Sequence, residues 1–284
     1  KGGDAVLQFW RSFAIFKEGS TPEAIRELDN ISKRREIQYA ASVALVHYHK
    51  SCSLVDQEAV THHKSQKSNL VNSAPDVSLI VAAQFLSLVG KYLKARQQVM
   101  QVLERNPANL QALNVLAWVE INGGVQGDMG TADRALDQVI EEADEMIYTK
   151  FVDCLLGKAK LFNNMKKFSD TLEILNDLLV KNPRFVPGLV EKAKVQMMTG
   201  NWDELVESSQ KILAVSRDNI EALRIWTFHA LAREASYDLA IDKLKHLHSA
   251  LVKREPKNAH LYIQVVKPLA QITGRNRKVL QETL

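Results

Sequence analysis

The chain has 284 residues, of which 46% are hydrophobic and 25% are charged, so it is long and apolar enough to bury a sizeable core. Its formal net charge of +4 is a mild excess, too small to indicate a nucleic-acid partner by itself. No apolar run approaches the roughly 18 residues of a membrane-spanning helix, which argues against direct membrane insertion.

A period of 34 residues organises the chain and is most complete in Asp76–Pro107. Within this segment apolar and small residues recur at the spacings of two helices that each bury one face. These residues are Leu79, Ala82, Ala83, Leu86, Gly90, Tyr92, Ala95, Val99, Val102 and Pro107. A fixed period of this length is typical of the tetratricopeptide repeat, a helix–turn–helix unit that stacks on copies of itself to bury its apolar face.

Taken in chain order, the pattern predicts seven helix pairs and the start of an eighth. The repeats begin near Ala5, Ile37, Asp76, Leu110, Val152, Val186, Glu221 and His260, and the last is cut off at the chain end. Position 8 of each first helix must be small, because the second helix crosses closely there. This position holds Ser12, Ala44, Ala83, Ala117, Ala159 and Ala193 in the first six repeats, and Phe228 in the seventh.

Two slips interrupt the period. Position 20, the small position of the second helix, comes about three residues late in the second repeat, at Ala59, and about six residues late in the fourth, at Ala135. The stretch 61–75 is polar and poorly periodic, so we expect an irregular connection from Thr61 to Pro75. We expect residues 123–130, which hold four glycines, to form an insertion between the two helices of the fourth repeat.

The predicted fold is all-α. We expect residues 1–284 to form a single continuous tetratricopeptide-repeat superhelix, an α-solenoid of about seven repeats plus a truncated eighth. The sequence begins at Lys1 without a methionine and stops at Leu284 inside a helical pattern, so we also expect a fragment of a longer protein.

Several groups of residues resemble chemical sites but fit structural roles better. The glycines of the insertion lack the preceding strand and the following Lys-Ser/Thr of a phosphate-binding loop. The carboxylates of 141–145 fall on helices that we expect to be solvated. One group of potential metal ligands matches no zinc spacing: His47, His49, Cys52, His62 and His63. We therefore expect no catalytic residue, no cofactor and no metal site, and the protein is not predicted to be an enzyme.

The remaining charged and thiol groups point to an ordinary intracellular surface. Cys52 and Cys154 make no disulfide framework and favour a reducing, cytoplasmic setting. The basic runs 33–35, 166–167 and 275–278 are short and scattered, as on a solvated face, and predict no nucleic-acid partner.

The inner face of the repeat array is the better candidate for function. In tetratricopeptide repeats, positions 2, 5, 9 and 12 of the first helix line the concave side. Aromatic residues there supply contact area, and Asn and Lys hold backbone groups or carboxylates. Four such residues in the middle of the chain are candidates to contact a partner protein, with packing inside the superhelix as the open alternative: Asn114, Trp118, Lys160 and Lys194.

The same positions are apolar near the amino terminus and hold a histidine in the seventh repeat. For the phenylalanines we favour packing against the next repeat, because large apolar side chains are usually buried. The residues are Phe9, Phe13, Phe16, Leu45, Tyr48 and His229. The Lys and Asn pattern with which chaperone-binding repeats clamp a carboxylate is absent: its positions hold Ile80, Gln84, Val115, Asp153 and Gly157.

Three stretches resemble one particular family. They are FWRSFAIFKEGSTPEAIRELDNI (Phe9–Ile31), YAASVALVHYHKS (Tyr39–Ser51) and NPANLQALNVLAWVEI (Asn106–Ile121). All three are similar to the amino-terminal region of tetratricopeptide repeat protein 21. The similarity covers most of the chain in order, including both slips.

This resemblance implies a non-catalytic scaffold, a repeat-only subunit of intraflagellar transport complex A that acts in retrograde ciliary transport and brings membrane proteins into cilia. The implied partners are the other subunits of complex A and adaptors for ciliary membrane cargo. The implied location is the cilium, at the axoneme and the basal body. The alternative is a peptide receptor, such as a co-chaperone or transport adaptor, that binds short segments in its concave groove. The missing clamp weighs against the co-chaperone form.

Overall fold

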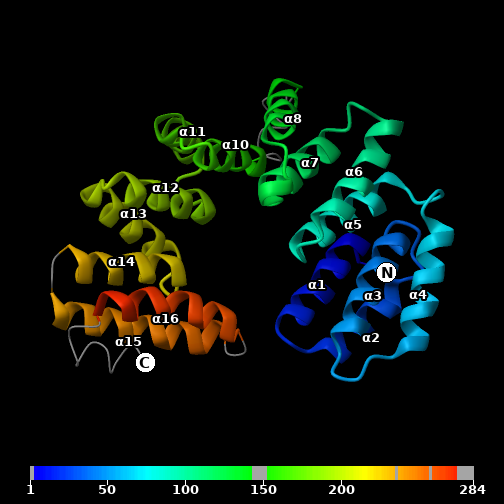
Figure 1. The fold of residues 1–284 in the computed structure, drawn as a ribbon, viewed down its shortest axis with the longest axis horizontal. Coiled ribbons are helices and arrows are strands. Elements are labelled where there is room, and N and C mark those ends of the chain that lie inside the picture. The colour runs from blue at the N-terminus through cyan, green and yellow to red at the C-terminus, as the bar shows by residue number, and fades with distance from the viewer. Residues whose placement is uncertain (1–2, 143–151, 234–235, 256–257, 274–284) are drawn as a thin grey trace. The chain divides into compact units, whose positions relative to one another are not determined.

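The computed structural model describes residues 3–142, 152–233, 236–255 and 258–273. Within these ranges all regular structure is helical, which confirms the predicted all-α fold (Figure 1). No helix in the described ranges is both long and apolar enough to cross a membrane. The chain divides into two compact units, Lys1–Gly157 (unit 1) and Lys158–Leu284 (unit 2). The single continuous superhelix over both units stays a prediction. The basic run 275–278 lies outside the described residues, as do two of the four carboxylates of 141–145, Asp144 and Glu145.

The helices of unit 1 follow one another as hairpins. They are α1 (Ala5–Lys17), α2 (Thr21–Ile31), α3 (Gln38–Ser51), α4 (Gln57–Leu70), α5 (Asp76–Leu88), α6 (Tyr92–Arg105), α7 (Leu110–Asn122), the 3₁₀ turn η1 (Gly124–Gln126) and α8 (Met129–Glu142). The next helix, α10 (Val152–Asn164), begins in unit 1 and ends in unit 2.

Unit 2 continues the same alternation of first and second helices. Its helices are α11 (Phe168–Lys181), α12 (Val186–Thr199), α13 (Trp202–Val215), α14 (Ile220–Ala232), α15 (Tyr237–Arg254) and α16 (Ala259–Thr273). The eighth repeat therefore begins with α16, as predicted.

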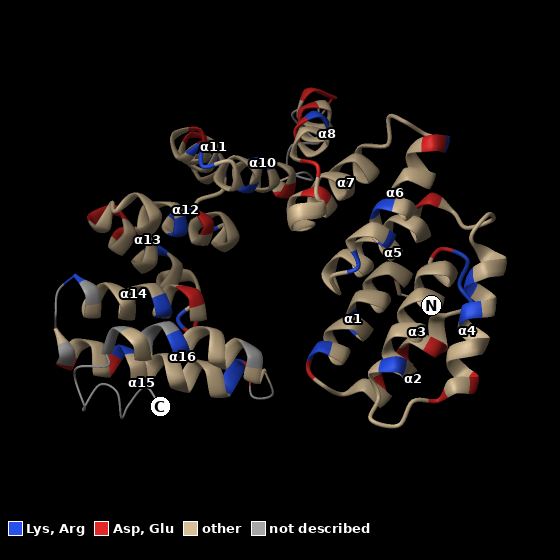
Figure 2. Ribbon diagram, viewed as in Figure 1, with Lys and Arg blue, Asp and Glu red and all other residues tan. Residues whose placement is uncertain are grey.

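First and second helices differ in burial. In unit 1, eight residues of α3, eight of α5 and nine of α7 are buried, against two each in α2 and α4 and four each in α6 and α8. A first helix packs against its own second helix and against the neighbouring pairs, whereas a second helix covers one side only. Figure 2 shows the consequence: α5 and α7 are almost free of charge, since they carry only Asp76 and Glu120.

At the close crossing of each helix pair, a small residue of the first helix faces a buried residue of the second. One small residue of the first helix is fully buried in all seven pairs, at the eighth residue of the helix except in α3, where it is the seventh: Ser12, Ala44, Ala83, Ala117, Ala159, Ala193 and Thr227. The fourth residue of the second helix is also buried, with at most 1% exposure: Ala24, Val60, Ala95, Ala132, Thr171, Leu205 and Ala240. In the first pair the two positions are joined directly, because the Ser12 hydroxyl donates to the Ala24 carbonyl at 2.8 Å.

The predicted irregular connection 61–75 is wrong for most of its length. Residues 61–70 complete α4, and only Val71–Pro75 connects α4 to α5. The only residues that α4 buries are Val60 and His63. Because so few of its residues are buried, α4 shows no apolar period in the sequence. The helix is nevertheless capped at its start, where Asp56 accepts a hydrogen bond from the Ala59 backbone N–H at 2.9 Å.

The size of both slips also needs correction. The buried fourth residue of the second helix is Val60 and not Ala59 in the second pair, and Ala132 and not Ala135 in the fourth. The slips are therefore four and three residues relative to the first pair. The insertion lies between α7 and α8 as expected, but its last two residues, 129–130, already belong to α8.

The seventh repeat begins one residue earlier than predicted. Because α14 starts at Ile220, its eighth residue is the buried Thr227 and not Phe228. A small buried residue thus lies at this crossing in every described pair, at position 8 of the first helix or, in α3, at position 7.

We expect Ala83→Leu to lower the free energy of unfolding by about 1–3 kcal/mol, because the larger side chain has no room at the crossing of α5 and α6. The matched control is Ala14→Leu on the exposed side of α1, which should change it by less than about 0.5 kcal/mol. Urea unfolding followed by circular dichroism measures both. Equal effects of the two variants would contradict the close-crossing argument.

Candidate protein-binding groove

A pocket of ≈ 420 Å³ opens between the first helices of unit 1. Its lining comes from α1 (Trp10), α5 (Gln84, Ser87, Leu88), α7 (Asn114, Val115, Trp118, Asn122) and the first turn of α10 (Asp153). Two of the four predicted groove residues, Asn114 and Trp118, therefore lie in one pocket. They sit one helical turn apart on α7 and face the same side.

Asn114 is held at the pocket floor by a carboxylate. It is only 6% exposed, and its Nδ2 donates to Asp153 Oδ2 at 2.6 Å. Because a carboxylate only accepts hydrogen bonds, the NH₂ group of Asn114 must face Asp153. The amide oxygen, Oδ1, is buried and has no hydrogen-bond partner in the described part of the chain.

Trp118 is packed on one side and lines the pocket on the other. Its indole covers Gly157, where a Cβ would lie 3.4 Å from Cε2, and Leu136 lies beside it. The indole of Trp118 therefore packs close to the backbone of α10 at Gly157.

Lys160 and Lys194 belong to unit 2, so the structure does not bring them together with Asn114 in one unit. Lys160 is half-buried on α10. Lys194 donates to Glu191 on the same helix at 3.0 Å, so part of its charge is already neutralised. Their role in partner binding stays a prediction.

The apolar residues predicted for the amino-terminal groove are mostly core. Phe9, Leu45 and Tyr48 are fully buried, and Phe16 stacks on Tyr48 with ring centroids 4.4 Å apart. Phe13 packs edge-on against Phe85 of α5 at 5.5 Å. The packing interpretation is confirmed for this cluster. His229 is likewise buried, at position 10 of α14.

Sequence reasoning missed seven of the nine described pocket residues: Trp10, Gln84, Ser87, Leu88, Val115, Asn122 and Asp153. Gln84, Ser87 and Asp153 occupy positions 9, 12 and 2 of their helices, which are groove positions, so the repeat numbering could have found them. Trp10 is at position 6 of α1, outside the groove pattern. It lines the pocket beside the fully buried Phe9, whose ring lies edge-on to its own at 5.2 Å.

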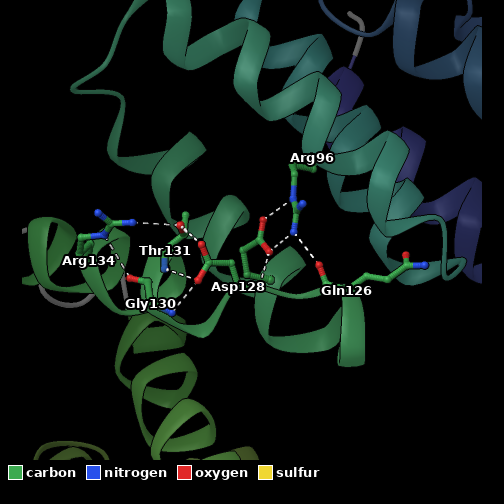
Figure 3. Close-up of polar contacts among 7 residues, drawn as sticks. Arg96, Gln126, Asp128, Gly130, Thr131 and Arg134 are labelled. Carbon is green, nitrogen blue, oxygen red and sulfur yellow. Dashed lines mark hydrogen bonds and ion pairs between the residues drawn. The ribbon is translucent and has the colours of Figure 1, made fainter.

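The glycine-rich insertion is built around a buried ion pair (Figure 3). The Glu120 side chain on α7 is 2% exposed and accepts hydrogen bonds from Arg96 Nε at 2.5 Å and from Arg96 Nη2. It also accepts from the Asp128 backbone N–H at 2.8 Å, while Arg96 donates to the Gln126 carbonyl at 3.0 Å. The pair therefore holds Gln126 and Asp128 of the insertion against α6 and α7, and the Glu120 carboxylate raises the pKa of Arg96.

The backbone of the insertion packs against and hydrogen-bonds to other residues of the chain. A Cβ at Gly127 would overlap the Glu120 carbonyl oxygen, so only glycine fits this approach. Asp128 then starts α8 by accepting from the Thr131 hydroxyl at 2.6 Å and from the Gly130 N–H at 3.0 Å, and these bonds lower its pKa. This arrangement supports the structural interpretation of the glycines over a phosphate-binding loop.

The histidines predicted to be structural surround the junction of α3 and α4. His49 and His63 stack with centroids 5.6 Å apart, and no group of three or more His, Cys, Asp or Glu side chains among the described residues is placed to hold a metal. His47 lies between the rings of Phe16 and Phe85, and Lys91 Nζ donates to its Nδ1 at 3.2 Å. Burial, aided by Lys91 and Lys17, lowers the pKa of His47 to about 4.

Comparison with known families identifies the chain. The tetratricopeptide repeat protein 21 N-terminal ARM repeat matches residues 1–206, and the second ARM domain of the same protein matches residues 242–284. The chain belongs to the tetratricopeptide repeat protein 21 family. The predicted resemblance is confirmed. The family description uses the term ARM repeat, and both terms denote stacked helical repeats.

Curated members of the tetratricopeptide repeat protein 21 family align with almost the whole chain. Protein 21B of Xenopus laevis is 29% identical over 279 residues, which are 98% of this chain and 21% of the relative. Protein 21A of Mus musculus is 31% identical over 276 residues, which are 97% of this chain and 20% of the relative. The chain thus spans about one fifth of the length of these family members.

Solved structures share the fold of this family member. A tetratricopeptide repeat protein from Parabacteroides merdae superposes with a TM-score of 0.58 at 17% identity and covers 99% of both chains. A thermophilic TPR protein of Thermus thermophilus gives 0.55 at 17% identity and covers 69% of this chain and 99% of its own. The tetratricopeptide-repeat solenoid fold is confirmed.

We expect Arg96→Met to lower the free energy of unfolding by roughly 3–5 kcal/mol, because it leaves the buried Glu120 carboxylate without its cation. Glu120→Gln should cost less, about 1–3 kcal/mol, because Arg96 is 35% exposed and can turn to water. Urea unfolding measures both, and exposed Arg134→Met is the control. The idea fails if Arg96→Met costs no more than Glu120→Gln.

The lowered pKa of His47 makes stability depend on pH. The unfolded chain takes up this proton near pH 6.5 and the folded chain only near pH 4, so His47 contributes stability above 6.5 that is lost as pH falls towards 4. The free energy of unfolding should therefore fall in this window by roughly 1–2 kcal/mol more than in His47→Gln, after allowance for partial exposure of the ring. Exposed His248→Gln is the control. Equal pH slopes in wild type and His47→Gln would refute the assignment.

Proposed function

We propose that the chain is part of a non-catalytic scaffold that binds other proteins, as a subunit of intraflagellar transport complex A. Its role would be retrograde ciliary transport and the delivery of membrane proteins into cilia. Family membership supports the choice of assembly. The observation that carries protein binding is the pocket of unit 1, in which Asn114 and Trp118 face one space with Trp10 and Leu88.

The chemistry of this pocket suits a protein segment. Trp10, Trp118 and the 58%-exposed Leu88 offer apolar area that solvent does not favour, and tryptophans are common among residues that dominate binding energy. Gln84 and Asn114 add amide groups that can hold a backbone. A sulfate- or nucleotide-like ligand has no cation to bind among the described lining residues.

The proposed partners follow from the proposed assembly. They are the other subunits of complex A and adaptors for ciliary membrane cargo, with no nucleic acid and no direct membrane insertion. The proposed location is the cytoplasm and the cilium, at the axoneme and basal body.

The alternative is a receptor for short peptides, such as a co-chaperone or a transport adaptor. The same pocket favours it, because ≈ 420 Å³ accommodates one or two side chains of an extended segment. The chaperone form would need the cationic clamp, and its positions in unit 1 hold Ile80, Gln84 and Val115.

Replacing the four predicted groove residues by alanine (Asn114, Trp118, Lys160 and Lys194) should weaken binding to the natural partners at least roughly tenfold. Affinity purification of the full-length protein from ciliated cells, with quantitative mass spectrometry, measures the loss. The matched control replaces Asn69, Leu93, Lys64 and Lys211, which are exposed on second helices. Unchanged binding to every partner would contradict a role of these four residues in partner binding.

Crosslinking of the full-length protein in ciliated cells separates the two functions. A scaffold should crosslink over broad faces to complex A subunits. Crosslinks only to soluble chaperones would overturn the ciliary proposal and favour the receptor.

A further inference from the structure

We propose that the pocket of unit 1 binds a basic side chain, arginine above all, presented by a segment of a partner protein. The inference rests on the proposed function of protein binding and adds the chemistry of the partner. It reverses the charge expected of a chaperone-type groove, in which the protein is the cation and the ligand the anion.

The first argument is the charge of the pocket. Asp153 alone carries a formal charge among the described residues that line it. None of the ion pairs of the described chain includes Asp153, and its hydrogen bond comes from the neutral amide of Asn114. The carboxylate therefore has acceptor capacity left for a cation.

The second argument is the unpaired acceptor beside that carboxylate. Asn114 Oδ1 is buried without a partner, and its orientation is set by the bond from Nδ2 to Asp153. Buried acceptors are nearly always satisfied, so this atom favours a ligand that donates. A carboxylate ligand could satisfy neither group and would meet Asp153 as a like charge.

The third argument is the shape of the walls. Two indoles, Trp10 and Trp118, and the exposed Leu88 line the same space. A guanidinium is attracted to indole faces, and the methylene stem of arginine covers apolar surface. Arginine also carries five donors in a fixed fork, enough for Asp153 and Asn114 Oδ1 together, whereas lysine offers a single ammonium and a leucine anchor leaves both acceptors unpaired.

Four peptide libraries test the proposal. All peptides are 13 residues long, carry fluorescein and have random, uncharged flanks. The central residue is Arg in one library, Lys in the second, Gln in the third and Glu in the fourth. Fluorescence anisotropy measures binding to the 284-residue chain. We expect the Arg library to bind most tightly, Lys next, and Gln and Glu at least roughly tenfold more weakly than Arg.

Two variants connect the preference to the pocket. Asp153→Asn keeps an acceptor for Asn114 and removes the charge, so the Arg library should bind about as weakly as the Gln library. Ser87→Phe fills the pocket without changing Asp153 or Asn114 and should abolish the preference even if Asp153→Asn fails to fold. Asp177→Asn, on the exposed side of α11, makes the same chemical change elsewhere and should leave the order of the four libraries unchanged.

Each other outcome overturns the proposal. These outcomes are equal binding of the Arg and Gln libraries, a preference for Glu, no binding of any library, or an Arg preference that survives both pocket variants. The proposed function is tested separately. If the full-length protein does not co-purify with complex A while the Arg preference persists, membership of that assembly is contradicted and the proposed pocket chemistry stands.

Discussion

The close crossing of paired helices is the constraint on which the rest of the structure depends. Two backbones can approach at such a crossing only if the side chains between them are small, and seven of seven described pairs bury a serine, alanine or threonine there without residual exposure. Because this contact repeats, each first helix is covered by its own partner and by the neighbouring pairs. A first helix such as α5 or α7 then has no surface left for charge except at its ends.

Because neighbouring helices bury most of each first helix, few of its positions can contact a partner protein. On α7 the polar and aromatic residues that line the pocket are Asn114, Trp118 and Asn122, and α10 adds Asp153 from the next pair. None of them takes part in the helix crossing. Asn114 and Trp118 also contact the next pair, through Asp153 and Gly157, but the side chains that face the pocket can change without altering the crossing itself. A repeat scaffold of unchanged architecture can therefore recognise partners of different charge. Fold and partner choice are thus carried by different positions of the same helix.

The 34-residue period predicts the fold well because the small residues that define it lie where paired helices cross. It locates six of the seven small buried positions, and it misplaces the seventh by one residue because Phe228 and Thr227 are neighbours in a helix whose apolar residues are nearly continuous. The period does poorly where a helix buries little. α4 shows two buried residues in fourteen, so the polar segment 61–70 reads as irregular although it is helical. Its helicity depends on the cap at Asp56 and on packing against α3, and neither leaves an apolar pattern in the sequence.

The sequence predicts only part of the candidate site, because packing between helices leaves no pattern in it. Repeat numbering assigns Asn114 and Trp118 to the inner face, but it treats each helix as isolated and cannot tell which residues of separate pairs share one pocket. That requires the packing of α1 against α5, which Phe9 and Phe13 establish by edge-on contacts with Phe85. Trp10 of α1 and Asp153 of α10 then line the same pocket as the residues of α5 and α7. The acidic and aromatic character of the site therefore arises from tertiary packing, and a motif search confined to one helix sees only its two neutral or apolar members.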